Sequence, residues 1–302
     1  MNLRDLQYLT AVAKYRHFGK AAEACFVSQP TLSTQIKKLE EELGVTLIER
    51  DNKNVILTDI GHKIVAKARQ TLQAVDEMRD IASLHNDPQA GTFRLGIIPT
   101  LAPYVLPHIM PVLQTRFPKL RLLLYEYQTA VLLKKLPAGD VDAALLALPI
   151  ADPNLKFQLL FKEPFFAAVP NNHRLADRNA IQLDELDKQG VLLLEDGHCL
   201  RDQALDICRE VGATETEGFR ATSLETLRQM VCSGTGMTFM PALATVNSPS
   251  DPSIVRYIPF NNPTPDRSIA IFYRSSSHRE NVIITMGDII KEKINTVLNT
   301  LP

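Results

Sequence analysis

The stretch SQPTLSTQIKKLEEELG, residues 28–44, carries the signals that decide the fold of the first part of the chain. Ser28 is a typical helix N-cap, and Pro30 falls in the first turn, where its missing N–H costs nothing. Apolar residues then recur at steps of three and four, as on the buried side of a helix; they are Leu32, Ile36, Leu39 and Leu43. Gly44 is a typical helix end. The pattern predicts one amphipathic helix with a small, polar opposite face.

Two shorter amphipathic stretches, residues 3–13 and 19–24, precede this helix. Three short helices, the last with a polar N-terminal face, are typical of a helix-turn-helix whose third helix enters the major groove of DNA. The polar face predicted to meet DNA consists of Gln29, Pro30, Thr31, Ser33, Thr34 and Lys37. Gln29 and Ser33 are placed to reach base edges, whereas the two threonines and the lysine suit phosphates. A plain surface helix would explain the same residues equally well.

The segment after this helix favours the DNA-binding interpretation. Residues 45–47 and 55–57 are short apolar stretches that predict two strands, and the segment between them includes Arg50 and Lys53. A hairpin with such a basic tip would serve as the wing that holds the phosphate backbone. The first 60 residues carry eight basic and eight acidic side chains, and the whole chain has a net charge of −1. A generally basic, histone-like binder is therefore excluded, and only local placement can reveal a DNA surface.

A long helix is predicted from about residue 59 to residue 85, with Thr58 as its cap. Its apolar and small residues repeat at alternating steps of four and three, which is a heptad seam; they are Ile64, Ala68, Thr71, Val75, Met78 and Ala82. Such a seam is either a core face of one domain or a helix pair between two copies of the chain. Between two domains, pairing with a second copy is the favoured interpretation.

After the linker at residues 86–91 the pattern changes to alternating strands and helices, which predicts an α/β fold with right-handed crossovers. The alternation runs through to a closing helix at residues 278–299 and suggests two lobes, 91–163 with 267–302, and 164–266. Polar residues stand where predicted strands turn into helices: Thr100, Thr129 and the pair Thr222-Ser223. Each suits a helix N-cap, and together they suggest a small polar pocket at one sheet edge.

The stretch EDGHCLRDQALDIC, residues 195–208, places two of the four cysteines nine residues apart on one predicted helix. An intact helix would put Cys199 and Cys208 on opposite faces, roughly 13 Å apart along the axis. A disulfide needs Cα atoms within about 7 Å, so the thiols could join only if the helix unwound. His198 and Arg201 would favour a thiolate at Cys199, and the neighbouring acidic residues would oppose it. Taken alone, the pattern also fits two buried, inert thiols, as we expect for Cys25 and Cys232.

The first part of the chain resembles the LysR-type transcriptional regulators. The motifs are AAEACFVSQPTLSTQIKKLEEELGVTLIER at residues 21–50 and LTDIGHKI at residues 57–64. The resemblance implies a winged helix-turn-helix over residues 1–58, a linker helix over 59–87, and a two-lobed effector domain over 91–302 similar to periplasmic binding proteins. It also implies DNA contacts for Arg4, Ser33 and Arg50.

The later motifs, GHCLRDQAL and FRATSLETLRQMV, resemble the peroxide-sensing branch of that family. This likeness implies that Cys199 reacts with hydrogen peroxide and that Cys208 then forms a reversible disulfide with it. It further implies that Thr100, Thr129 and His198 line the peroxide site. A metabolite-responsive regulator with incidental cysteines is one alternative, and a thiol peroxidase enzyme is another. Residues 1–57 argue against the enzyme, because catalysis would not need them.

The expected partners follow from this function. They are double-stranded promoter DNA, one or three further copies of the chain, RNA polymerase and a glutathione-linked reductant. The chemistry requires no metal or organic cofactor. No apolar run approaches the ~18 residues of a membrane span, and the N-terminus lacks the apolar core of a signal peptide, so we expect a cytoplasmic protein.

Overall fold

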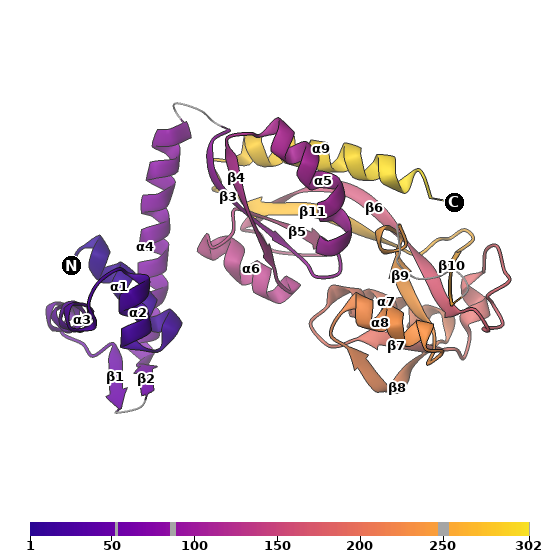
Figure 1. The fold of residues 1–302 in the computed structure, drawn as a ribbon, viewed down its shortest axis with the longest axis horizontal. Helices are drawn as coiled ribbons and strands as arrows, with labels where there is room; N and C mark the ends of the chain where they lie inside the picture. Colours follow the sequence, from indigo (N-terminus) through magenta and orange to yellow (C-terminus); the bar gives the residue numbers. More distant parts are fainter. Residues whose placement is uncertain (52–53, 85–88, 247–253, 302) are drawn as a thin grey trace. The chain divides into compact units, whose positions relative to one another are not determined.

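The computed structural model describes residues 1–51, 54–84, 89–246 and 254–301. The chain forms two compact units, Met1–Asp87 with one hydrophobic core and Pro88–Pro302 with two (Figure 1). In the described ranges no helix is both long enough and apolar enough to cross a membrane.

The first unit is a winged helix-turn-helix. Helices α1 (Leu3–Tyr15), α2 (Phe18–Ala24) and α3 (Gln29–Leu43) precede the antiparallel strands β1 (Ile48–Asp51) and β2 (Asn54–Leu57). Ser28 caps α3 as predicted, and Gly44 ends it with φ 68°. Three of the four predicted stripe residues, Leu32, Ile36 and Leu39, are buried, and Leu43 packs at the edge of the same core.

The first wing strand was predicted three residues too early. Residues 45–47 precede β1, because the Glu40 carboxylate accepts the backbone N–H groups of Leu47 and Ile48 and holds the chain in a turn there. The strand begins at Ile48 and includes Glu49 and Arg50, which were expected in the tip. Lys53 lies outside the described residues, as does the side chain of Arg50.

The long helix α4 (Asp59–Leu84) begins as predicted, with the Thr58 hydroxyl accepting the N–H of Gly61. The predicted seam is divided between two environments. Ala68 is buried in the core of the first unit, whereas the side chain of Met78 is 67 % exposed. The first half of the seam thus belongs to the unit's own core, and only the second half is left for pairing. Ala82 contributes no described side chain.

The second unit contains one mixed seven-stranded sheet and one separate two-stranded sheet. The strand order of the larger sheet is β10-β6-β11-β5-β3-β4, with β9 also paired to β6. The connecting strand β6 (Leu155–Pro170) pairs with β11 (Asp266–Arg274) through its first part and with β9 (Thr238–Pro241) and β10 (Val255–Pro259) through its last part. The sequence pattern predicts a strand only at residues 164–169, which is the second half of β6. The first half was missed because apolar and polar residues alternate only weakly there, and two of its apolar residues, Phe157 and Leu159, are exposed.

Two hydrophobic cores lie along this sheet. The first joins β3 (Gly91–Ile97), β4 (Leu120–Glu126) and β5 (Ala143–Ala147), which are mutually parallel, to helices α5 (Ala102–Arg116), α6 (Thr129–Ala138) and α9 (Glu280–Leu298). Helices α5 and α9 lie together on one face of the sheet, and α6 lies on the other (Figure 1). Packing of α6 is close: a Cβ at Gly96 would lie 2.4 Å from the side chain of Leu132.

The second core joins the last part of β6 to the parallel pair β7 (Gly190–Leu194) and β8 (Thr214–Ala221) and to helices α7 (Cys199–Val211) and α8 (Leu224–Cys232). Hydrogen bonds connect the two lobes. The Tyr104 hydroxyl, from α5, donates to the Glu225 carboxylate of α8 at 2.7 Å. The two-lobed α/β architecture is therefore confirmed, while the residue limits assigned to each lobe remain a prediction.

Candidate functional site

The N-terminal face of α3 is open to solvent. Gln29, Pro30, Thr31, Thr34 and Lys37 are exposed, and Ser33 is half-buried. The Thr31 hydroxyl lies 2.7 Å from Ser28 Oγ, and Lys37 Nζ lies 3.7 Å from the Glu41 carboxylate. Both pairs are exposed and therefore weak enough to be exchanged for phosphate contacts. Arg4 is exposed at the start of α1, where Asn2 and Asp5 form a capping box.

The second candidate site lies at the start of α7. Cys199 is the first residue of this helix, and Cys208 follows nine residues later in the same unbroken helix. Cys199 is half-buried and packs against the first core, whereas Cys208 is 3 % exposed and belongs to the second core. Both thiols are free. The predicted separation of the two cysteines on an intact helix is thus confirmed, and each thiol lies against a different lobe.

The helix begins at a tight turn that touches the other lobe. Gly197 has φ 95°, and a Cβ there would lie only 2.7 Å from Oε1 of Gln128, the N-cap residue of α6. The positive φ favours glycine here, and any larger residue would also have to displace the Gln128 side chain. His198 is buried and occupies the N-cap of α7, but its side chain makes no capping hydrogen bond. Any movement of Cys199 must be accommodated at this junction.

Thr100 and Thr129 follow two neighbouring parallel strands. Ile97 of β3 is paired with Glu126 of β4, so the two threonines stand three residues beyond the same sheet edge. The hydroxyl oxygen of Thr129 is buried and has no hydrogen-bond partner among the described residues. Since a buried hydroxyl without a partner is unfavourable, it is suited to bind a small polar ligand. Ser223, by contrast, uses its hydroxyl to cap α8 by accepting the N–H of Thr226.

Thr100 is joined to a buried ion pair that the sequence analysis missed. Arg267 donates to the Thr100 hydroxyl at 3.0 Å and to its carbonyl at 3.1 Å, and it pairs with the Glu163 carboxylate at 2.7 Å. Both charged side chains are fully buried. Because Thr100 Oγ accepts this bond, its own proton is free to point elsewhere. The available signal was an arginine two residues before the apolar run of β11, residues 269–272.

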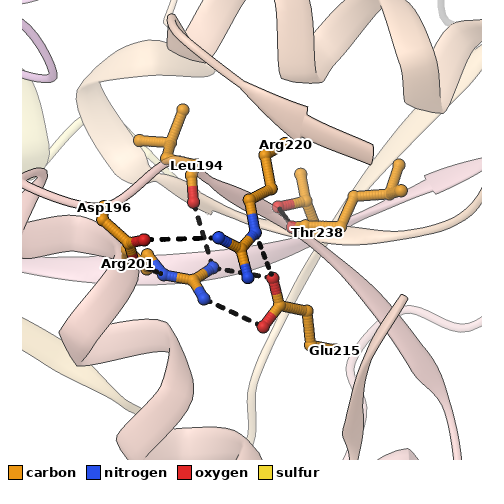
Figure 2. Close-up of polar contacts among 7 residues, drawn as sticks. Leu194, Asp196, Arg201, Glu215, Arg220 and Thr238 are labelled. Atoms are coloured by element: carbon orange, nitrogen blue, oxygen red, sulfur yellow. Dashed lines mark hydrogen bonds and ion pairs between the residues drawn. The ribbon is translucent and has the colours of Figure 1, made fainter. Parts of the chain in front are cut away.

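A second cluster of charges holds the first turn of α7 (Figure 2). The Arg201 guanidinium donates to both carboxylate oxygens of Glu215, at 2.8 and 2.9 Å, to Asp196 at 2.9 Å, and to the Leu194 carbonyl at 3.1 Å. Arg220 binds the same two carboxylates, Asp196 and Glu215. Arg201 was expected to act on the Cys199 thiol, but its charge is used by these carboxylates. The pKa of Glu215 is lowered chiefly by the hydrogen bond from Arg201.

The environment of Cys208 makes it unreactive in this state. Burial raises the pKa of its thiol to about 11. At neutral pH the thiol is therefore protonated, and the thiolate is the form that attacks. Cys25 and Cys232 pack partly buried against the cores of their own units, as expected. In the part of the chain that the structure describes, no group of three or more His, Cys, Asp or Glu residues could hold a metal ion.

Comparison with known families agrees with this architecture. Residues 3–62 match the bacterial regulatory helix-turn-helix protein of the lysR family, and residues 86–295 match the LysR substrate binding domain. The chain therefore belongs to the LysR family of bacterial transcriptional regulators. This is a family of regulators and not of enzymes, as the sequence analysis predicted.

Individual relatives are more specific. The chain is 44 % identical to the hydrogen peroxide-inducible genes activator of Pectobacterium carotovorum over 100 % of this chain and 99 % of the relative. It resembles full-length OxyR of Pseudomonas aeruginosa, a cysteine-to-aspartate variant, with TM-score 0.79 and 38 % identity over 96 % of this chain and 95 % of that one. A peroxide-bound cysteine-to-serine variant of Corynebacterium glutamicum OxyR matches with TM-score 0.69 and 35 % identity. This match covers 99 % of this chain and 94 % of that one. The predicted function class, a peroxide-sensing regulator, is confirmed.

Proposed function

We propose that hydrogen peroxide switches this regulator by converting Cys199 and Cys208 into a disulfide that cannot exist while α7 is intact. The observation that carries the proposal is the position of the two thiols. They lie nine residues apart on one unbroken helix, one against the first core and one within the second. The disulfide therefore requires α7 to unwind, and unwinding changes the packing of both lobes.

In the first step the Cys199 thiolate attacks one oxygen of hydrogen peroxide. An S–O bond forms as the O–O bond breaks, and the leaving hydroxide takes up a proton to become water. Cys199 is thereby oxidised to a sulfenic acid by two electrons. The hydroxyls of Thr100 and Thr129 hold the peroxide in line with the sulfur, and His198 closes the site. The free hydroxyl proton of Thr100 and the unpartnered oxygen of Thr129 support these roles.

In the second step the Cys208 sulfur attacks the sulfenic sulfur, and a second water leaves. Leu200, Ile207 and Cys208 must leave the second core for the two sulfurs to meet. Exposing a buried aliphatic side chain changes the free energy by roughly 1.5–3 kcal/mol. Two or three such side chains span the ~5.5 kcal/mol that moves a two-state equilibrium from 1:99 to 99:1. The oxidised chain therefore adopts a different packing of its two lobes.

The new packing is passed to promoter DNA through an assembly of two or four copies, paired along the exposed second half of α4. Contacts with DNA come from α3, from Arg4 and from the wing, including Arg50 and Lys53. The altered DNA contacts recruit RNA polymerase to oxidative-stress genes. A glutathione-linked reductant in the cytoplasm reverses the disulfide by thiol exchange and resets the switch.

The proposal is tested with the full-length protein and its Cys208→Ser variant. Peroxide should oxidise Cys199 to sulfenic acid in both, as detected by dimedone labelling. Only the wild type should keep a changed DNA footprint after peroxide is removed. A variant with both cysteines changed to serine should not respond at all. A retained peroxide response in that double variant would instead identify a metabolite-type regulator with incidental cysteines.

The role of Thr100 has its own test. Thr100→Val should slow the reaction of Cys199 with peroxide more than its alkylation by a bulky iodoacetamide. A hydroxyl that orients peroxide matters only to peroxide, whereas a change in the thiol itself would affect both reagents. Equal slowing would remove Thr100 from the peroxide site.

A further inference from the structure

The turn between α2 and α3 has a phenylalanine where a helix end ordinarily has glycine. The N–H of Phe26 donates to the Glu23 carbonyl at 3.1 Å, and the N–H of Val27 donates to the Ala22 carbonyl at 3.0 Å. This pair of bonds is the Schellman ending of a helix, which needs a residue with positive φ. Phe26 supplies it with φ 56°. Its Cβ therefore crowds the following carbonyl, which a glycine would avoid.

Three other helices of the chain end at glycine, whereas α1 ends at Arg16, which also has a positive φ, of 47°. The residues that follow α3, α6 and α7 are Gly44, Gly139 and Gly212, all with φ between 68° and 75°. Across the described ranges, only Arg16, Phe26 and Lys188 have positive φ without being glycine. The backbone of Phe26 thus gives no reason for a bulky side chain there.

Burial gives no reason either. The neighbours Cys25 and Val27 both pack against the core of the first unit, but the side chain of Phe26 is 94 % exposed. It is the most exposed of the large apolar residues that the structure describes. Phe26 thus combines a strained backbone with an apolar ring that is exposed to solvent. A binding partner outside the chain would explain both features.

The position of the turn identifies the partner. Phe26 stands two residues before Ser28, which caps α3, and it therefore borders the exposed first turn formed by Gln29, Pro30 and Thr31. If α3 enters the major groove, as in the proposed function on which this inference rests, Phe26 reaches the margin of that groove. We propose that Phe26 makes an apolar contact with the 5-methyl group of a thymine. That methyl is the apolar group that base edges present in the major groove.

The proposal is tested on a duplex selected from a randomised pool by the full-length wild-type protein. Fluorescence anisotropy gives the affinity of the wild type and of Phe26→Ala, Phe26→Gly and Phe26→Leu. Each thymine of the duplex is then replaced in turn by uracil, which keeps base pairing and lacks only the methyl. Lys188→Gly is the matched control, because it places glycine at a positive-φ position of the other unit.

Phe26→Ala and Phe26→Gly should each weaken binding about tenfold, and Phe26→Leu should weaken it less. Uracil at one position should weaken binding of the wild type but cause no further loss in Phe26→Ala. The thermal unfolding of Phe26→Gly should be unchanged or higher, since glycine relieves the strained φ, so that lost binding cannot be ascribed to unfolding. Lys188→Gly should bind as the wild type does.

Equal affinity of Phe26→Ala and wild type would overturn this inference and leave the proposed DNA-binding function standing. A loss of affinity with no thymine position coupled to Phe26 would also overturn it, because the ring would then contact sugar or another copy of the chain. If the wild type selected no duplex from the pool, the proposed function and this inference would fail together.

Discussion

Helices α3 and α7 are similar in length, with 15 and 13 residues, yet they are stabilised in opposite ways. Helix α3 carries its own signals: Ser28 caps it, Pro30 starts it and its apolar stripe enters a single core. Helix α7 has no side-chain cap at its first turn, which is held by Arg201 and its partners, and its two thiols lie against different cores. A helix held by its own sequence stays formed, whereas one held by distant contacts can be released when those contacts change.

The largest expected difference comes from removing one buried leucine from each helix. Leu32→Ala in α3 and Leu200→Ala in α7 should each destabilise their folded unit by about 2–5 kcal/mol. Only Leu200→Ala should also alter the redox switch, because Leu200 leaves its pocket in the proposed oxidation step. The reduction potential of the disulfide should become about 40–110 mV more negative, since the reduced form alone loses stability. Titration against glutathione buffers measures it, and an equal shift in Leu32→Ala would remove the distinction between the helices.

The charge cluster at the start of α7 gives a smaller effect. Glu215→Gln removes the bidentate partner of Arg201 and should speed disulfide formation by about three- to tenfold, because the reduced helix is held less firmly. Asp206→Asn is the matched control, since Asp206 pairs with Arg209 on the exposed side of the same helix. That exposed pair contributes little, and its loss should leave the rate unchanged. Stopped-flow kinetics after addition of peroxide measures the rate of disulfide formation. Equal rates in the wild type, Glu215→Gln and Asp206→Asn would show that the charge cluster does not restrain α7.

A third prediction concerns pH. Burial raises the pKa of the Cys208 thiol to about 11, whereas an unfolded cysteine titrates near pH 8.5. Between these values the unfolded chain loses the proton first, so the free energy of unfolding falls as pH rises through this window and is not affected below it. By pH 10 the loss should be about 2 kcal/mol in reduced wild type relative to Cys208→Ser. Urea unfolding at pH 7 and pH 10 measures it. Parallel behaviour of the two proteins would mean that Cys208 is not buried as described.

The smallest effect is expected on the DNA-binding face of α3. Lys37→Gln should weaken DNA binding a few-fold and reduce the slope of log affinity against log salt by about one, as for the loss of one phosphate contact. The fold should be unaffected, because Lys37 is exposed and its pair with Glu41 is weak. An unchanged salt slope would remove Lys37 from the DNA surface.

The sequence predicted α3 and α7 better than it predicted what surrounds them. Caps, apolar steps and terminal glycines are local signals, so residues 28–44 were assigned almost to the residue. The first half of β6 was missed because its identity comes from pairing with β11, more than a hundred residues later. Arg267 and Glu163 were missed for the same reason: 104 positions separate them in the chain, and only the fold joins them beside Thr100.

The two cysteines also show that local sequence signals do not reveal long-range contacts. Helical spacing alone predicted that their thiols are separated, and the structure confirms it. Spacing could not reveal that Cys199 faces the first core while Cys208 lies in the second, nor that Arg201 is turned toward Glu215. Those facts depend on which strands and helices the second unit brings together around α7.

The central claim is that peroxide unwinds α7 and leaves α3 intact. Hydrogen exchange of the full-length protein, before and after a stoichiometric dose of peroxide, measures both helices in one experiment. The backbone amides of residues 200–208 should lose their protection once the disulfide has formed, while those of α3 should exchange at the same rate in both states. Protection of residues 200–208 that persisted in protein shown by mass spectrometry to contain the 199–208 disulfide would contradict the central claim.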